Sequence, residues 1–396
     1  MKLTLCQQLS QFTHLLQSCL FPVLEEQIGV LDARAKRLVA TLEMIPLARF
    51  VPSSRGWMGR PSKDRYAMAC AFVAKAVYGF TTTRQLLERL TQDAQMRQIC
   101  GWTAAQPLPH EATFSRAFAE FALMELPQFV HEALIRETQG DRLIGHIARD
   151  STAIEARERF PETDRPHPTQ AVAPVPPKRS KKGSRGPHKR WKGGKPRRKS
   201  NPETRLHRQR TMGLREMLDD LPQDCSIGMK TNSQGHEQHW RGYKLHLDVA
   251  DGQIPISAVL TGAKVHDSQV AIPLATMSTQ RVTYCYELMD AAYDAQEIRE
   301  HIQAMGHVAI VDPAARGRKS KSVTIPLGKQ PRQFSWAEAE RYQERTMIER
   351  VNARLKDEFG ARFIRVRGAA KVMAHLMFGV LALTVDQLLR LGVEVT

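Results

Sequence analysis

The chain has 396 residues, of which 42% are hydrophobic, so it is long enough for two or three domains with buried cores. Its 58 lysines and arginines exceed the 41 acidic residues and give a formal charge of +17, which predicts a polyanionic partner, either nucleic acid or an anionic membrane surface. The six cysteines form no CxxC pair, and the longest apolar stretch, around residues 377–385, is too short to span a bilayer. We therefore expect no disulfide framework, no cysteine zinc site and no membrane span, but a cytoplasmic, nucleoid-associated protein.

Residues 1–140 are typical of a helical domain. Residues 67–77 are rich in alanine, and Thr83 is placed to cap a following helix. Helical spacing recurs in a leucine group and in an aromatic stripe, which are Leu86, Leu87 and Leu90, then Phe114, Phe118, Phe121 and Met124. We expect these side chains in a core, and DNA binding or assembly as the role of the domain. A helix-turn-helix between Thr82 and Ile99 fits the pattern, as does an ordinary helix pair.

From residue 141 the pattern changes to strands, and residues 141–396 are predicted to form a second domain. The first strand is expected over 143–148 and ends at Asp150. A long excursion over about 156–238 follows. Its centre, residues 178–199, holds twelve lysines or arginines and no acid, so it is predicted to be disordered without a partner. Such a segment binds phosphates through counterion release or is merely a solvated loop. Its candidate DNA-binding residues are Lys181, Lys182, Arg190, Arg197 and Arg198.

The remainder of the second domain alternates between strands and helices. Strands are expected over 241–249, 254–260, 282–289 and 307–311, and helices over 267–277, 294–305, 334–359 and 371–391. The fourth strand ends at Asp290. The predicted order is therefore β-β-β-α-β-α-β-α, followed by one more apolar helix.

The helix expected over 334–359 carries an unusual polar face. Tyr342, Arg345, Glu349, Asn352 and Lys356 follow one another at offsets of 3, 4, 3 and 4. At about 100° per residue they fall within roughly 80° of one another. An adjoining apolar face, Ile348, Val351 and Leu355, can pack on a core. The polar face is either a solvated surface with i,i+4 ion pairs or a site for a phosphate backbone and a metal ion.

Three acids occupy positions that can converge. Asp150 and Asp290 end neighbouring strands, and a helix across the sheet can present Glu349 to the same spot. Converging carboxylates repel unless cations neutralise them, so Mg²⁺, with Mn²⁺ as a substitute, is the expected ligand. Two such ions suit phosphodiester displacement. For either aspartate alone, a surface carboxylate that caps or pairs locally is the competing interpretation. Asp294 is expected to be an N-cap, and His266-Asp267 a turn before a helix.

Tyr342-x2-Arg345-x3-Glu349-x6-Lys356 resembles the Y-R-E-K signature of bacterial insertion-sequence DDE transposases. The order of elements is similar to their ribonuclease H-like catalytic core, and residues 59–61 through 114–115 resemble their helical N-terminal domain. The resemblance implies that Asp150, Asp290 and Glu349 are the catalytic acids. It also implies Mg²⁺-dependent cleavage at terminal inverted repeats, transfer of the 3′-hydroxyl ends into target DNA, and a homodimer in the synaptic complex.

The resemblance implies an α/β fold with a ribonuclease H-like mixed-sheet core and a helical N-terminal domain, and the composition adds a disordered basic insertion. One departure concerns the insertion. Only 58 residues separate Asp290 from Glu349, too few for the β-rich insertion that such proteins often carry there. Contacts made by that insertion, including those that trap a flipped base, are therefore not transferred. Two alternatives stay open, a non-catalytic DNA-binding protein and a nuclease without strand transfer.

Overall fold

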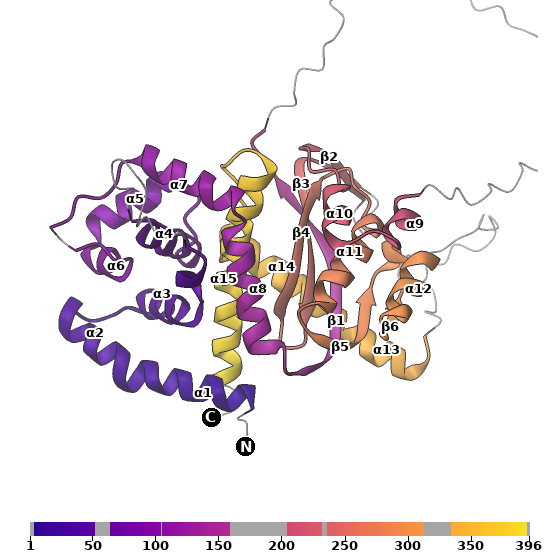
Figure 1. Cartoon of the computed structure of the whole chain (residues 1–396), viewed down its shortest axis with the longest axis horizontal. Helices are drawn as coiled ribbons and strands as arrows, with labels where there is room; N and C mark the ends of the chain where they lie inside the picture. The colour runs from indigo at the N-terminus through magenta and orange to yellow at the C-terminus, as the bar shows by residue number, and fades with distance from the viewer. Residues whose placement is uncertain are drawn as a thin grey trace, which may run out of the picture.

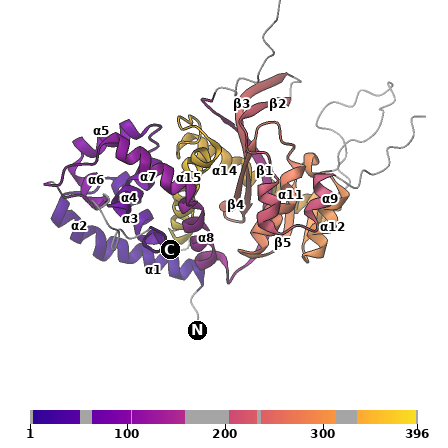
Figure 2. The ribbon, with the colours of Figure 1, turned by 45° about the horizontal axis from the view of Figure 1, so that its top comes forward.

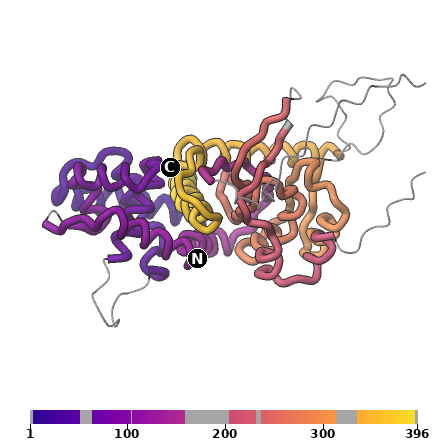
Figure 3. Tube along the Cα trace, turned by 90° about the horizontal axis from the view of Figure 1, so that it is seen from above, coloured from indigo at the N-terminus to yellow at the C-terminus, as the bar shows by residue number. Residues whose placement is uncertain are grey.

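A computed structural model describes residues 4–51, 64–103, 105–158, 204–231, 236–312 and 334–393. A helical layer formed by the N-terminal residues lies beside a six-stranded mixed sheet, and the helix α15 (Ala369–Val393) runs between them (Figure 1). The same order is seen from above in Figure 3. Residues 59–61 and the five basic residues proposed in the insertion, Lys181 to Arg198, lie outside the described residues.

The described N-terminal residues are helical, as predicted. Their helices are α1 (Leu5–Leu15), α2 (Phe21–Ile28), α3 (Ala33–Met44), α4 (Arg65–Val77), α5 (Thr83–Gln92), α6 (Ala94–Ile99), α7 (Glu111–Leu123) and α8 (Leu126–Gln139), with a π-helical segment at Leu16–Leu20. The cap of α5 is Thr82 rather than Thr83, because the Thr82 hydroxyl accepts from the amide of Gln85. The aromatic stripe is buried in α7, except that Met124 ends the helix and is 39% exposed.

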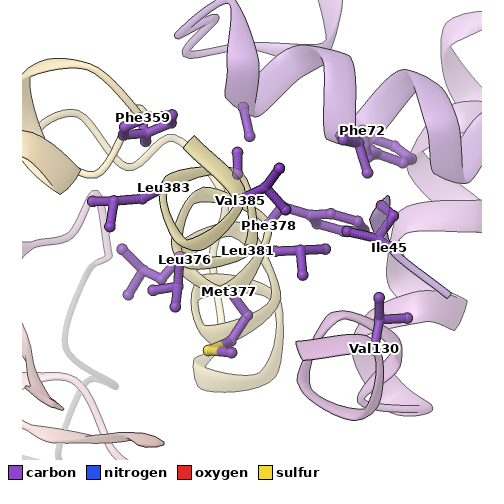
Figure 4. Packing of buried hydrophobic residues seen from close by; sticks show 14 of the residues in the cluster. Ile45, Phe72, Val130, Phe359, Leu376, Met377, Phe378, Leu381, Leu383 and Val385 are labelled. Carbon is purple, nitrogen blue, oxygen red and sulfur yellow. The ribbon is translucent and has the colours of Figure 1, made fainter. Parts of the chain in front are cut away.

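Helix α15 is the centre of the main core. Figure 4 shows Phe378 and Leu381 pointing toward Phe72 and Val130 of the helical layer, and the rings of Phe72 and Phe378 lie 5.9 Å apart. The same core continues to the sheet, so residues on both sides of position 140 share it. By length and composition α15 is apolar enough to cross a membrane, but 89% of its most apolar window is buried inside the protein. Its place in the core accounts for its composition.

The sheet has the order β2-β3-β1-β5-β6, with β4 on β3. Its strands are β1 (Leu143–Glu155), β2 (Ser226–Thr231), β3 (Glu237–Ala250), β4 (Ile254–Gly262), β5 (Thr283–Met289) and β6 (Val308–Val311). β1 pairs antiparallel with β3 and parallel with β5, β5 pairs parallel with β6, and β2 and the start of β3 extend beyond the rest (Figure 2). This mixed sheet agrees with the predicted ribonuclease H-like core.

Two predicted boundaries were wrong. β1 does not end at Asp150 but continues to Glu155, because its pairing with β3 continues to Gly242. The insertion is shorter than 156–238, since residues 204–231 form α9 (Arg205–Gln209), α10 (Leu214–Asp219) and β2. These short helices fold because Met217 and Leu221 bury against residues of the sheet domain.

The helices of the sheet domain are α11 (Ser268–Thr279), α12 (Gln296–Ala304), α13 (Trp336–Tyr342) and α14 (Thr346–Asp357). The predicted continuous helix over 334–359 was wrong, because a 3₁₀ turn at Gln343–Arg345 separates α13 from α14. The N-cap of α12 is Ala295, so the prediction that Asp294 caps this helix was wrong. Instead, Asp294 accepts from the Arg299 guanidinium at 3.1 Å.

A buried lysine joins the helical layer to α15. Lys75 Nζ lies 3.0 Å from His375 Nδ1, and His375 Nε2 lies 3.0 Å from the Gly360 carbonyl, so Nε2 donates and Nδ1 accepts. Burial lowers the pKa of Lys75 from 10.5 to about 7. Burial, with the nearby Lys75, also lowers the pKa of His375 to about 3. The two groups therefore titrate in different pH ranges.

We expect the free energy of unfolding to rise with pH between about 7 and 10.5, by up to about 1.4 kcal/mol per pH unit. In this window the unfolded chain holds a proton on Lys75 that the folded chain has released. The rise in stability is therefore absent below the pKa of Lys75 in the folded state and complete above its pKa in the unfolded state. Lys75→Met should flatten the profile in urea unfolding, and Lys371→Met, at an exposed position of α15, should not. Equal slopes in wild type and Lys75→Met would contradict the prediction.

Candidate active site

The pairing of β1 with β5 places Asp150 and Asp290 side by side. The last pair in the parallel register is Arg149 with Met289. The residue that follows each of them is an aspartate, Asp150 or Asp290. Adjacent strands lie about 4.8 Å apart. Each carboxylate is fixed by a backbone amide, Asp150 by that of Ser151 at 2.7 Å and Asp290 by that of Ala292 at 2.9 Å. Asp290 thereby caps the 3₁₀ turn Ala291–Tyr293.

The environment of the two aspartates disfavours their charged forms. Burial, and then the charge of Asp290, raise the pKa of Asp150 to about 6, although the Ser151 amide, Arg345 and Lys230 oppose the shift. Burial also raises the pKa of Asp290, and the charge of Asp267 adds to this. Arg345 and Lys230 act on both carboxylates, but they only partly offset the effect of burial.

The neighbourhood of the pair fits a hydrated divalent cation. The Tyr293 side chain is 1% exposed, and its hydroxyl has no hydrogen-bond partner among the described residues. Burial is the largest cause that raises the pKa of this hydroxyl. The charges of Asp267, Asp150 and Asp290 raise it as well. Water around a cation held by the pair would give the hydroxyl its missing acceptor, and carboxylate oxygens are the ligands that Mg²⁺ prefers. In the described part of the chain, however, no three His, Cys, Asp or Glu side chains already form a metal-binding group.

Glu349 does not lie with the aspartates but pairs with Arg345. Arg345 Nη2 lies 2.6 Å from Glu349 Oε1, and the Glu349 side chain is 55% exposed. Burial alone would lower the pKa of Arg345. The charges of Tyr342, Glu349, Asp150 and Asp290 outweigh burial, so the pKa is raised overall. Arg345 therefore contacts the third predicted acid directly and acts electrostatically on the other two.

The remaining residues of the predicted polar face differ in exposure. Tyr342 is buried with Leu288 and Ile310, and its ring lies 5.8 Å from the Arg345 guanidinium carbon. Asn352 is also buried, whereas Lys356 is half-buried. The apolar face packs as predicted, with Ile348, Val351 and Leu355 buried. Arg345 Nε and Asn352 Oδ1 are buried and have no hydrogen-bond partner among the residues described, so both can bind a ligand.

The sequence interpretation missed two groups near the aspartates. Lys230 of β2 acts on both Asp150 and Asp290, but its strand was assigned to the insertion. Asp267, which was assigned to a turn, accepts from Lys244 Nζ at 2.9 Å. Burial raises the pKa of Asp267, but His246, Lys244 and Ser151 hold it below its ordinary value.

A buried ionic cluster lies directly beneath the aspartates. Arg149 is fully buried and donates to both oxygens of Asp248 on β3, each at 2.8 Å, and lies 2.7 Å from Glu287 on β5. Because side chains alternate along a strand, Arg149 points to the opposite face from Asp150. The cluster therefore ties β3, β1 and β5 together at the level where Asp150 and Asp290 meet.

The chain was compared with known proteins. A family model described as Transposase DDE domain matches residues 143–385, from the start of β1 into α15. A second, described as Transposase domain (DUF772), matches residues 23–120 of the helical layer. No curated protein and no solved structure matches the chain. The first match covers more than half of the chain and contains Asp150, Asp290 and Glu349.

Proposed function

We propose that this chain, which belongs to the transposase DDE domain family, binds the terminal inverted repeats of a mobile element, cleaves phosphodiester bonds at its ends and transfers the 3′-hydroxyls into target DNA. The observation that carries the proposal is the in-register pair Asp150 and Asp290, half-buried and with raised pKa values, on which Arg345 also acts. Duplex DNA, as element ends and as target, is the proposed substrate. A homodimer is the proposed synaptic assembly.

Asp150 and Asp290 are proposed to hold divalent ions, Mg²⁺ or Mn²⁺ in its place, with Glu349 as the third ligand. When bound, such ions stabilise the charge on the attacking and leaving oxygens of a phosphodiester displacement. The protein's own part is to fix the two aspartates through the amides of Ser151 and Ala292, so that they need no reorientation. Glu349 is free to join them once Arg345 has another anion to bind.

A DNA phosphate is the proposed alternative partner of Arg345. Its Nε donor is unused, and guanidinium groups bind phosphate through two parallel hydrogen bonds. The Arg345 guanidinium lies over the Tyr342 ring. Asn352 and Lys356 continue this polar face along α14. The basic residues proposed in the insertion, Lys181, Lys182, Arg190, Arg197 and Arg198, would add non-specific phosphate contacts. The helical layer is proposed to recognise the ends or to support assembly.

The test uses the purified full chain and labelled duplex DNA that carries the inverted repeats flanking its coding region. With Mg²⁺ and a target plasmid we expect nicks at the repeat ends and a covalently joined product, and with a chelator neither. Nicks without joining would show a nuclease instead of a transposase. Binding with neither product would show a DNA-binding protein that has no such activity.

Replacing Glu349 by glutamine is expected to reduce the cleavage rate by at least about a hundredfold. This exceeds the loss that is typical when a residue that only hydrogen-bonds to a metal ligand is replaced. Folding should be unaffected, because an exposed ion pair contributes less than about 1 kcal/mol. Glu344→Gln is the matched control, since Glu344 is an exposed acid in the adjoining 3₁₀ turn. Cleavage is measured in single-turnover assays with Mg²⁺. Equal rates for the two variants would exclude Glu349 from the site.

A further inference from the structure

We propose a second DNA-binding site, a cationic groove beyond the far end of β1, that holds the DNA strand leading away from the cleavage site. The groove has a volume of about 240 Å³ and is lined by Glu155, Ala156, Arg157, Arg362, Phe363, Ile364 and Arg365. This inference rests on the proposed function, because it extends the same DNA beyond the aspartate pair.

The two walls of the groove are held together by a specific contact. One wall is the chain that leaves β1, and the other is the loop of residues 358–368 between α14 and α15. The Glu158 carboxylate accepts from the Tyr243 hydroxyl at 2.7 Å and from the Gly368 amide at 2.8 Å. In the loop, Ala361 and Ile364 are buried in the main core. The groove is therefore formed before a ligand arrives.

The charge of the groove suits a phosphate backbone. Arg157, Arg362 and Arg365 are exposed and outnumber Glu155, the acid in the lining. Arg362 also pairs with Asp357, through a hydrogen bond of 3.1 Å from its Nε. An exposed ion pair of this kind contributes less than about 1 kcal/mol, so a phosphate can replace Asp357 at little cost.

Cations connect the groove to the aspartate pair. Lys230 acts on Asp150 and Asp290, and it also acts on Lys356. Burial lowers the pKa of Lys356, and the positive charges of Arg362 and Lys230 lower it further. Lys356 therefore lies within electrostatic reach of Lys230 on the side of the pair and of Arg362 in the groove. Like charges this near one another cost free energy, and a bound polyanion compensates them.

Phe363 indicates how the groove would hold a base. Phe363 is 57% exposed and lies between the exposed Arg362 and Ile364, which is buried in the core. An exposed aromatic ring in a cationic groove is the arrangement that stacks on the bases of single-stranded nucleic acid. Glu155 is five residues beyond Asp150 in an extended strand, which is roughly 17 Å. We therefore expect the stacked base several nucleotides from the cleaved bond.

The test measures binding by the full chain to a duplex of arbitrary sequence with a single-stranded overhang that contains 2-aminopurine. Arg362→Gln with Arg365→Gln should weaken binding and reduce the slope of log affinity against log salt by about 2. Phe363→Ala should weaken binding about tenfold and abolish the quenching of 2-aminopurine, whereas Phe363→Tyr, which keeps the ring, should retain both. Arg390→Gln is the matched control, because Arg390 is an exposed arginine paired with Asp386 near the other end of α15.

The outcomes separate this site from the proposed function. A double arginine variant with the affinity and salt slope of Arg390→Gln would overturn the phosphate contacts. Quenching by Phe363→Ala equal to wild type would overturn the base contact. In either case, cleavage that still requires Asp150 would leave the proposed function standing. Conversely, a wild-type protein that never nicks DNA would refute that function even if the groove variants behave as expected.

Discussion

Asp150→Asn and Asp290→Asn are each expected to lower Mg²⁺-dependent cleavage of the element ends by at least about a thousandfold. A bound metal ion contributes several kcal/mol of transition-state stabilisation, and each 1.36 kcal/mol is a factor of ten in rate. Asparagine keeps the shape of the side chain and an acceptor for the Ser151 or Ala292 amide, but it removes one of two negative charges. Cleavage is measured under single-turnover conditions, and DNA binding by anisotropy.

Binding and folding should survive these two substitutions. Because burial already disfavours both charges, neutralising one should leave the free energy of unfolding unchanged or slightly higher. Asp294→Asn is the control, since Asp294 lies four residues beyond Asp290 and pairs with Arg299. Cleavage by Asp294→Asn should stay near the wild-type rate. Wild-type cleavage by either test variant would remove that aspartate from the catalytic set.

Arg149→Met is expected to destabilise the fold by about 3–5 kcal/mol, because it leaves Asp248 and Glu287 buried without their shared cation. Burial raises the pKa of Glu287, and the Arg149 guanidinium is the main influence that lowers it again. The remaining contacts, from Ser278 to Asp248 and from Tyr284 to Glu287, each at 2.6 Å, are single hydrogen bonds and cannot replace a guanidinium. Urea unfolding followed by circular dichroism measures the loss.

Two comparisons test the cause of this loss. Adding Asp248→Asn and Glu287→Gln to Arg149→Met should recover part of the stability, because no buried charge then remains in the cluster. Arg136→Gln, which breaks the exposed pair with Glu132, should cost less than about 1 kcal/mol. A loss of that small size for Arg149→Met would show that the cluster does not hold the sheet together.

The sequence was sufficient to align Asp150 with Asp290, because two apolar segments that each end in an aspartate pair in parallel with those ends level. It was not sufficient to place the end of β1. Residues 151–155 continue the alternation of exposed and buried positions, but Asp150 resembled a strand terminus. It also could not reveal the 3₁₀ turn before α14, since residues three apart lie close to one face in either kind of helix.

Long-range electrostatic neighbours were beyond sequence reasoning altogether. Lys230 acts on both aspartates from β2, which pairs with the start of β3, and no local pattern predicts that pairing. Arg149 was missed because a lone arginine before a candidate catalytic aspartate resembles a surface residue. Only the pairing of β1 with both β3 and β5 brings Asp248 and Glu287 to it.

The position of α15 has a consequence for how the protein is made. Helices α4, α7 and α8 pack on a segment, Ala369–Val393, that the ribosome synthesises long after them. At about 5–20 residues per second, the interval from the end of α8 to the start of α15 is roughly 10–50 seconds. Throughout that time the apolar faces that α15 covers in the folded protein lack this partner. Translation that stops before Ala369 would leave those faces exposed, which favours aggregation and proteolysis.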